Sequence, residues 1–125
     1  DLQGNLLREL PPCIGSLASL RFLNLKANEL KELPSSLTEL RSLDTLILAY
    51  NLTLSPTPTL ELIKQMRWLK YLDIGLMPWS KDSTVKLLRA NLPNTEIIAT
   101  PLDEYEMVPP PSWLRYYTKP FRQRW

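Results

Sequence analysis

The chain has 125 residues, of which 44% are hydrophobic and 22% are charged, and its formal net charge is +2. This length suits one domain with one core, and the small net charge gives no argument for nucleic-acid binding. No segment approaches the roughly 18 consecutive apolar residues of a membrane span, so no membrane partner is expected.

A repeated pattern runs through the first half of the chain. Asparagines recur every 23 residues at Asn5, Asn28 and Asn51 (28 − 5 = 51 − 28 = 23), and leucines recur with them. The fullest stretch, residues 20–43, reads Leu20-x-x-Leu23-x-Leu25-x-x-Asn28-x-Leu30-x-x-Leu33-Pro34-x-x-Leu37-x-x-Leu40-x-x-Leu43. A fixed period of about 20–29 residues with this leucine spacing is typical of a solenoid in which each unit supplies one short strand.

On these residues the chain resembles the leucine-rich repeat family, in the 23-residue "LP" subtype of intracellular proteins, here with Leu33-Pro34. The resemblance is close over residues 2–51 and can be followed to about residue 98. It implies a right-handed α/β solenoid with short parallel strands and a helical C-terminal cap. It also implies protein–protein interaction, usually without catalysis by the repeats themselves.

The strand of each unit reads x-Leu-x-Leu-x, and its period of two sends the leucines to the core and the residues between them to the concave side. Leu23 and Leu25, and then Leu46 and Leu48, are the expected core pairs. The return limb carries Leu33, Leu37 and Leu40. Pro34 is expected to stop an early helix there, and Ser35 and Ser36 to cap a short helical turn.

After Asn51 the register slips, since Leu48 and Ile74 are 26 residues apart (74 − 48) rather than 23. The extra length falls near residues 55–59, where two prolines favour a turn. Thr59 is a plausible N-cap for a helix over residues 60–68.

The spacing then predicts a return to 23 residues, which pairs Leu72 with Thr95 and Ile74 with Ile97. A helix over residues 84–90, starting after residues 80–83, has Val85, Leu87 and Leu88 as its apolar side. The last strand is expected over residues 95–99. Residues 1–99 are thus interpreted as repeats that end in a capping unit (76–99), and residues 100–125 as an extension.

The concave face of five stacked strands, about 4.8 Å apart, is the first candidate site. Its predicted columns are Phe22–Thr45–Tyr71, Asn24–Ile47–Asp73–Glu96 and Lys26–Ala49. Exposed aromatic and aliphatic side chains of this kind form interface hot spots, although scattered exposed apolar residues are normal. The expected partner is a protein, and the expected surface is Phe22, Asn24, Lys26, Thr45, Ile47, Tyr71, Asp73 and Glu96.

Residues 101–125 form the second candidate site, because they hold five of the twelve prolines and six aromatic residues. Pro109, Pro110 and Pro111 predict a stiff polyproline II run. Three interpretations remain open: the tail extends the cap, it docks on a protein partner, or it contacts RNA through arginines and stacked aromatics. The residues that would do so are Trp113, Arg115, Tyr116, Tyr117, Phe121, Arg122, Arg124 and Trp125.

Neither catalysis nor a cofactor, metal or small-molecule substrate is expected. The sequence has no histidine, and Cys13 therefore lacks the usual base that would activate it. The acidic run Asp103, Glu104 and Glu106 lacks the spacing of a calcium loop. A single cysteine without cysteine-rich caps favours an intracellular compartment. Asn51-Leu52-Thr53 is formally a glycosylation sequon, but we interpret Asn51 as part of an asparagine ladder.

The chain starts in the second half of a strand motif, with Gly4 and Asn5 near its first residue. We therefore expect the C-terminal piece of a longer array, or a subunit whose open end a partner covers. Two alternatives to a plain interaction module stay open. One is the recognition or regulatory domain of a larger enzyme or receptor, such as a ubiquitin-ligase-like effector or an immune receptor. The other is a structural subunit of a ribonucleoprotein that uses the basic aromatic tail.

Overall fold

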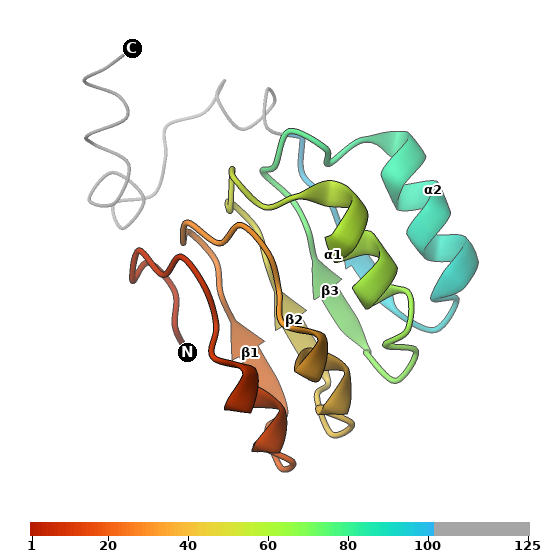
Figure 1. The fold of residues 1–125 in the computed structure, drawn as a ribbon. Helices are drawn as coiled ribbons and strands as arrows, with labels where there is room; N and C mark the ends of the chain where they lie inside the picture. The colour runs from red at the N-terminus through yellow and green to blue at the C-terminus, as the bar shows by residue number, and fades with distance from the viewer. Residues whose placement is uncertain (102–125) are drawn as a thin grey trace, which may run out of the picture.

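The structure is a computed structural model in which residues 1–101 are described. Four short strands form one parallel sheet whose spatial order follows the sequence, β1-β2-β3-β4 (Figure 1). The strands are β1 Phe22–Asn24, β2 Thr45–Ile47, β3 Tyr71–Asp73 and β4 Glu96–Ile98. The predicted α/β class with parallel strands is confirmed, but the fifth strand is not. The N-terminal segment only bonds alongside β1, with the Leu2 and Gly4 amides donating to the Asn24 and Lys26 carbonyls at 2.9 Å each.

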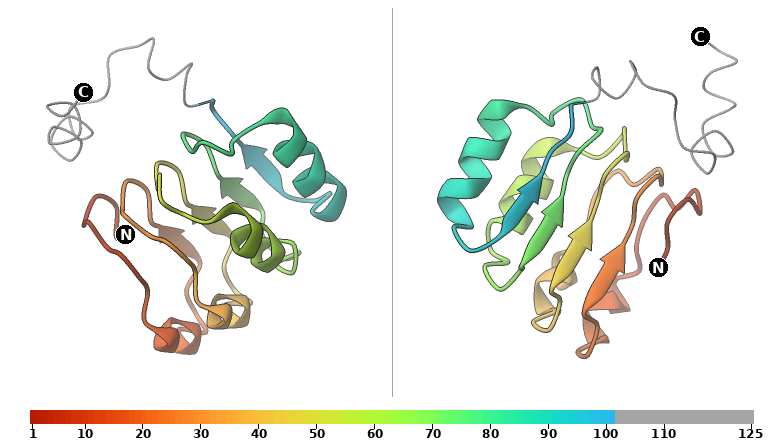
Figure 2. Two further views of the ribbon diagram at one scale, coloured as in Figure 1. Left: turned by 45° about the horizontal axis from the view of Figure 1, so that its top comes forward. Right: turned by 180° about the vertical axis from the view of Figure 1, so that it is seen from behind.

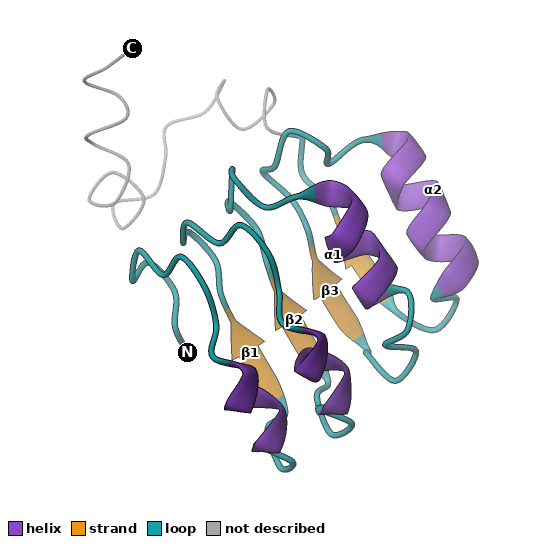
Figure 3. Cartoon of the chain, viewed as in Figure 1, coloured by secondary structure: helices purple, strands orange, loops and turns teal. Residues whose placement is uncertain are grey.

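The helical segments all lie on one side of this sheet (Figure 3). They are the 3-10 helices η1 Pro12–Ser16 and η2 Ser35–Glu39 and the α-helices α1 Pro56–Ile63 and α2 Asp82–Asn91. The right-hand view of Figure 2 shows the sheet from the other side, which no element of residues 1–101 covers. We call this second side the open face. It corresponds to the face that the sequence predicts to be concave.

The core is built from the strand leucines and from those of the return segments. Leu23 is 3% exposed, and Leu25, Leu46 and Leu48 are each 0% exposed, so the expected core pairs are confirmed. Leu25 and Leu48 directly follow the last residues of β1 and β2. Leu37 and Leu40 of the return segment are buried as well, while Leu33 is partly buried against this core. The leucines of the strands and those of the return segments therefore pack together in one layer between the sheet and the helices.

Two asparagine side chains connect the first three units of the chain where it leaves the sheet. The Asn51 Nδ2 donates to the carbonyls of Leu25 and Leu48 at 2.9 and 2.7 Å. The Asn28 Nδ2 does the same for Leu2 and Leu25, at 3.0 and 2.9 Å, and its Oδ1 accepts two backbone amides. Asn51 is fully buried. The ladder interpretation is confirmed, because the Asn51 amide nitrogen is buried and bonds main-chain oxygens of two units.

The residue before each asparagine adopts a left-handed backbone. Gly4, Ala27 and Tyr50 have φ values of 70°, 59° and 59°, and Leu76 takes the same place in the fourth unit with 58°. The amide of each donates to a carbonyl of the next unit; Tyr50 N, for example, donates to Gly75 O at 3.1 Å. Non-glycine residues rarely adopt this conformation. The ladder bonds on either side therefore hold the chain in this turn.

The predicted slip of three residues after Asn51 is confirmed, because Ile47 pairs with Asp73 in the sheet (73 − 47 = 26). The helix expected over residues 60–68 lies earlier in the chain than predicted. It is α1, which begins at Pro56 after Ser55 and ends at Ile63. Proline is well accommodated in the first helical turn, where its missing N–H costs nothing. Thr59 is no cap: it lies inside the helix, and its buried hydroxyl has no hydrogen-bond partner.

In the last unit, α2 agrees with the expected helix over residues 84–90 and extends it at both ends. Leu88 is buried and Val85 is partly buried, but Leu87 is 42% exposed, so its assignment to the apolar side was wrong. Residues three apart share a helical face, whereas adjacent residues are turned by about 100°. Among residues 1–101, no helix has the length and apolar character that crossing a bilayer requires.

The expected serine cap of the short turn is also wrong. The turn itself forms as η2, but its N-cap residue is Pro34 and no side chain caps it. The Ser36 hydroxyl is buried without a hydrogen-bond partner. A tight turn of this type closes with backbone bonds, such as Leu37 N to Pro34 O at 3.0 Å, and needs no side-chain acceptor.

Truncating Leu25 or Leu48 to alanine is expected to lower the free energy of unfolding by about 2–5 kcal/mol, because each leaves a cavity in a fully buried layer. Leu17→Ala is the matched control, since Leu17 is 51% exposed and its loss should stay within about 0.5 kcal/mol. Urea denaturation followed by circular dichroism measures all three. A loss below about 1 kcal/mol for both core variants would mean that the strand register is wrong.

Candidate functional site

The strand register aligns side chains into two columns on the sheet. The first column is Phe22, Thr45, Tyr71 and Glu96, and the second is Asn24, Ile47, Asp73 and Ile98. Glu96 was predicted in the second column, which is wrong. The step from Tyr71 to Glu96 is 25 residues (96 − 71), not 23, so the predicted pairs Leu72–Thr95 and Ile74–Ile97 are also wrong.

The turn before β4 explains this shift of two residues. The Thr95 hydroxyl donates to the Leu69 carbonyl at 2.7 Å, and the Glu96 amide donates to the Lys70 carbonyl at 2.9 Å. Thr95 is therefore a buried part of the turn and lies before the strand, although the sequence pattern predicts it within the strand. Leu72 is paired with Ile97 instead, and both are buried.

An aromatic and aliphatic patch lies across three strands of the open face. Phe22 is 46% exposed at the start of β1, and Ile47 and Tyr71 are half-buried on β2 and β3. Thr45 is half-buried between the two aromatic residues in the first column. These side chains keep solvent-facing area while their backbone is held in the sheet, which is the property expected of an interface anchor.

Two residues expected on this surface are instead buried. Asn24 is 7% exposed, because its Nδ2 donates to Gln3 Oε1 at 2.8 Å and its Oδ1 accepts the Lys26 amide at 3.0 Å. Ala49 is 1% exposed. It lies after the end of β2 at Ile47, where strand alternation no longer applies. Lys26, after the end of β1, is half-buried.

The β3–β4 side of the open face carries the acidic groups. The Asp73 carboxyl is half-buried and accepts the Gly75 amide at 2.9 Å. Burial raises its pKa, and the Gly75 hydrogen bond and the charge of Lys26 only partly offset this. Burial also raises the pKa of the Tyr71 hydroxyl, with further contributions from Asp73 and Glu96. The negative charges of Asp73 and Glu96 therefore both disfavour ionisation of the Tyr71 hydroxyl.

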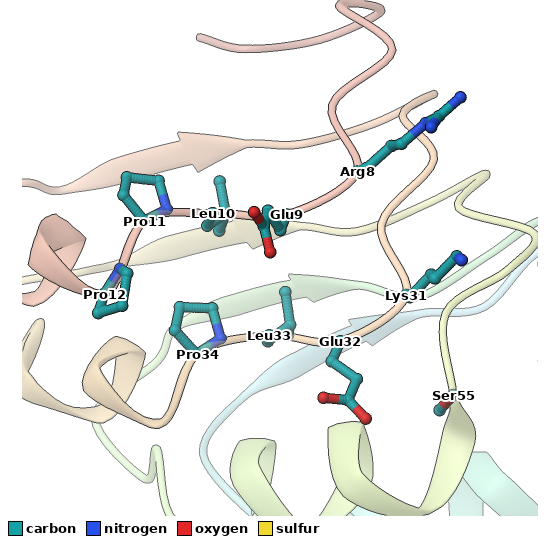
Figure 4. A pocket seen from close by; sticks show the side chains of 10 residues that line it. All are labelled: Arg8, Glu9, Leu10, Pro11, Pro12, Lys31, Glu32, Leu33, Pro34 and Ser55. Atoms are coloured by element: carbon teal, nitrogen blue, oxygen red, sulfur yellow. The ribbon is translucent and has the colours of Figure 1, made fainter.

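The structure also has a groove that was not predicted from the sequence. Two return segments and Ser55 enclose a groove of about 980 Å³ (Figure 4). Its lining is Arg8, Glu9, Leu10, Pro11, Pro12, Lys31, Glu32, Leu33, Pro34 and Ser55. The signal that could have found it is the order cation, acid, leucine, proline, which starts at both Arg8 and Lys31, 23 residues apart. Its cations and acids are equal in number, so it favours no ligand of one charge.

Chemistry of other kinds finds little support in the part of the chain that the structure describes. Over residues 1–101, no group of three or more His, Cys, Asp or Glu side chains is arranged to hold a metal ion. Cys13 is exposed on η1, and its carbonyl accepts the Ser16 hydroxyl at 2.7 Å. The tail interpretations all lie outside the described residues. They concern Trp113, Arg115, Tyr116, Tyr117, Phe121, Arg122, Arg124 and Trp125.

Neither a protein-family model nor a curated protein matches this sequence. The resemblance to leucine-rich repeats therefore depends on the chain's own residues. The open face with its patch and its two carboxyls is the site that the geometry supports best.

The raised pKa of Asp73 predicts a pH-dependent stability. The folded protein binds this proton more tightly than the unfolded chain, so the associated stabilisation is complete at low pH and is lost as pH rises through the raised pKa. Asp73→Asn keeps an acceptor for Gly75 and cannot titrate. Its stability relative to the unsubstituted chain should increase with pH above the ordinary value of 3.8 and then level off. Urea titrations at several pH values measure this, and a flat or falling difference would contradict it.

Proposed function

We propose that the chain forms a leucine-rich-repeat solenoid whose open face binds a protein partner without catalysis. The observation that carries the proposal is the exposed patch of Phe22, Ile47 and Tyr71 on the side of the sheet that residues 1–101 leave uncovered. The single cysteine supports an intracellular setting for this binding.

The solenoid part of the proposal is supported by bonds that recur with the sequence period. Asn28 and Asn51 make the same contacts one unit apart, and the left-handed turn recurs before each of them. In each unit the amide of the left-handed residue donates to a carbonyl of the next unit. Such contacts between neighbours are expected of stacked repeats.

The binding part is supported by the rigidity and position of the patch. Phe22 and Tyr71 are on hydrogen-bonded strands, so their backbone loses little conformational freedom when a partner binds. Four strands about 4.8 Å apart span only about 14 Å, and a standard interface needs roughly 800 Å² per partner. The partner is therefore expected to use the open face together with adjoining surface.

The double substitution Phe22→Ala with Tyr71→Ala should reduce partner capture by at least about tenfold, since hot-spot truncations commonly cost about 2 kcal/mol or more each. The thermal midpoint should change little, because Phe22 is 46% exposed and Tyr71 only half-buried. Affinity purification of the tagged chain from its source cells, quantified by mass spectrometry, provides the measurement. Leu87→Ala is the control, because it removes an exposed apolar side chain from α2, on the helical side. Capture that survives the double substitution undiminished would move the binding site off the open face.

A further inference from the structure

We propose that the open face is also the docking site of the chain's own residues 112–125, which compete in cis with a protein partner. This rests on the proposed function only in using the same face. Three features favour this occupant: the position at which the described residues end, the acids near that position, and the composition of residues 112–125.

The chain leaves the described residues beside the acidic end of the open face. The Thr100 carbonyl accepts the Leu76 amide at 2.8 Å, which holds the residues after β4 against the turn after β3. A Cβ atom on Gly75 would lie 2.8 Å from the Thr100 amide nitrogen and 3.2 Å from Asp73 Oδ1. Thr100, next to the last described residue, therefore lies near the Asp73 carboxyl.

Both acids of this face keep some exposure to solvent, so an additional cation can reach them. Glu96 is exposed, and Asp73 is half-buried with the Gly75 amide as its hydrogen-bond donor. Lys26 also acts on the Asp73 carboxyl, but its charge does not cancel the cost of burial, since the pKa of that carboxyl is still raised. A guanidinium or ammonium group that approached Tyr71 from the open side would meet both carboxylates and an aromatic ring.

The segment 112–125 has the complementary composition. It contains four cations and no acid, and five of its residues are aromatic. The cations are Arg115, Lys119, Arg122 and Arg124. Arginine forms bidentate bonds with carboxylates and stacks on aromatic rings, and aromatic pairs add to the burial of apolar area. Phe22, Ile47 and Tyr71 offer the apolar part of such a contact.

The residues that connect Pro101 to the docking segment are numerous enough to reach across the open face and few enough to keep the segment near it. Residues 102–111 provide ten residues, which span at most about 33 Å when extended, and the four strands span about 14 Å. A short tether of this kind gives an effective concentration in the millimolar range. A contact that is weak between separate molecules is then well populated within one chain, and a partner of the same face has to displace it.

The test uses the full chain, labelled with nitrogen-15, and no partner. Neutralising the tail by R115Q/K119Q/R122Q/R124Q should shift the amide resonances of β1, β2 and β3, because the docked segment leaves the open face. In a D73N/E96Q background, the same fourfold substitution should produce much smaller shifts. In an E9Q/E32Q background, which removes two acids from the groove on the return segments, the shifts should persist in full. Added salt should diminish them in the unsubstituted background.

Three results would overturn the inference. Shifts confined to α2 would assign the tail to the helical cap, and the absence of shifts would mean no docking. Shifts that grow with protein concentration would assign the contact to a second copy of the chain. The core amides of Leu25 and Leu48 report folding in every variant, and E96Q alone replaces the double background if they move. Because no partner is present, these results are independent of whether partner capture succeeds.

Discussion

The buried side-chain amides of Asn28 and Asn51 are the interaction on which the rest of this structure depends. Each chain segment that leaves the sheet exposes main-chain carbonyls to an apolar layer, where an unsatisfied polar group is costly. The Asn51 amide donates hydrogen bonds to the carbonyls of Leu25 and Leu48, which belong to two neighbouring units. The left-handed turn at Tyr50, which is uncommon for a non-glycine residue, is held by the bond from its amide to the Gly75 carbonyl. The same bonds recur at the 23-residue spacing that separates Asn28 from Asn51.

The open face follows from this spacing. Since each turn is fixed relative to the next, the strands align in register and their outward side chains form columns. The unit after Asn51 is three residues longer, and the extra length is taken up by α1 on the helical side, leaving the β2–β3 pairing regular. In the fourth unit Met77 replaces the asparagine, and the Ser80 hydroxyl bonds the Ile74 carbonyl instead. Hydrophobic and acidic groups therefore remain on one continuous surface despite the irregular units.

Predictions from sequence succeeded where local periodicity decides the outcome and failed where a turn decides it. The buried leucines, the role of Asn51 and the slip of three residues all follow from a repeated pattern. The pairing of β4 does not, because the bond from Thr95 to Leu69 resets the register by two residues. The burial of Asn24 depends on Gln3, a contact between units that alternation cannot reveal. The same holds for Trp68, whose indole N–H donates to the Leu40 carbonyl at 2.9 Å. The residues of the candidate patch, Phe22, Ile47 and Tyr71, were anticipated, whereas the place of Ile98 in the second column was missed with the β4 register.

The ladder amide of Asn51 determines how neighbouring units align. Asn5, Asn28 and Asn51 occupy the same place in the period, but Asn5 is exposed and Asn51 is fully buried. The most direct measurement is the free energy of unfolding of Asn51→Ala compared with Asn5→Ala, by urea denaturation. The account predicts a loss of about 1–3 kcal/mol or more for Asn51→Ala, which strands buried carbonyls, and a change within about 0.5 kcal/mol for Asn5→Ala. Equal and small effects at both positions would contradict it.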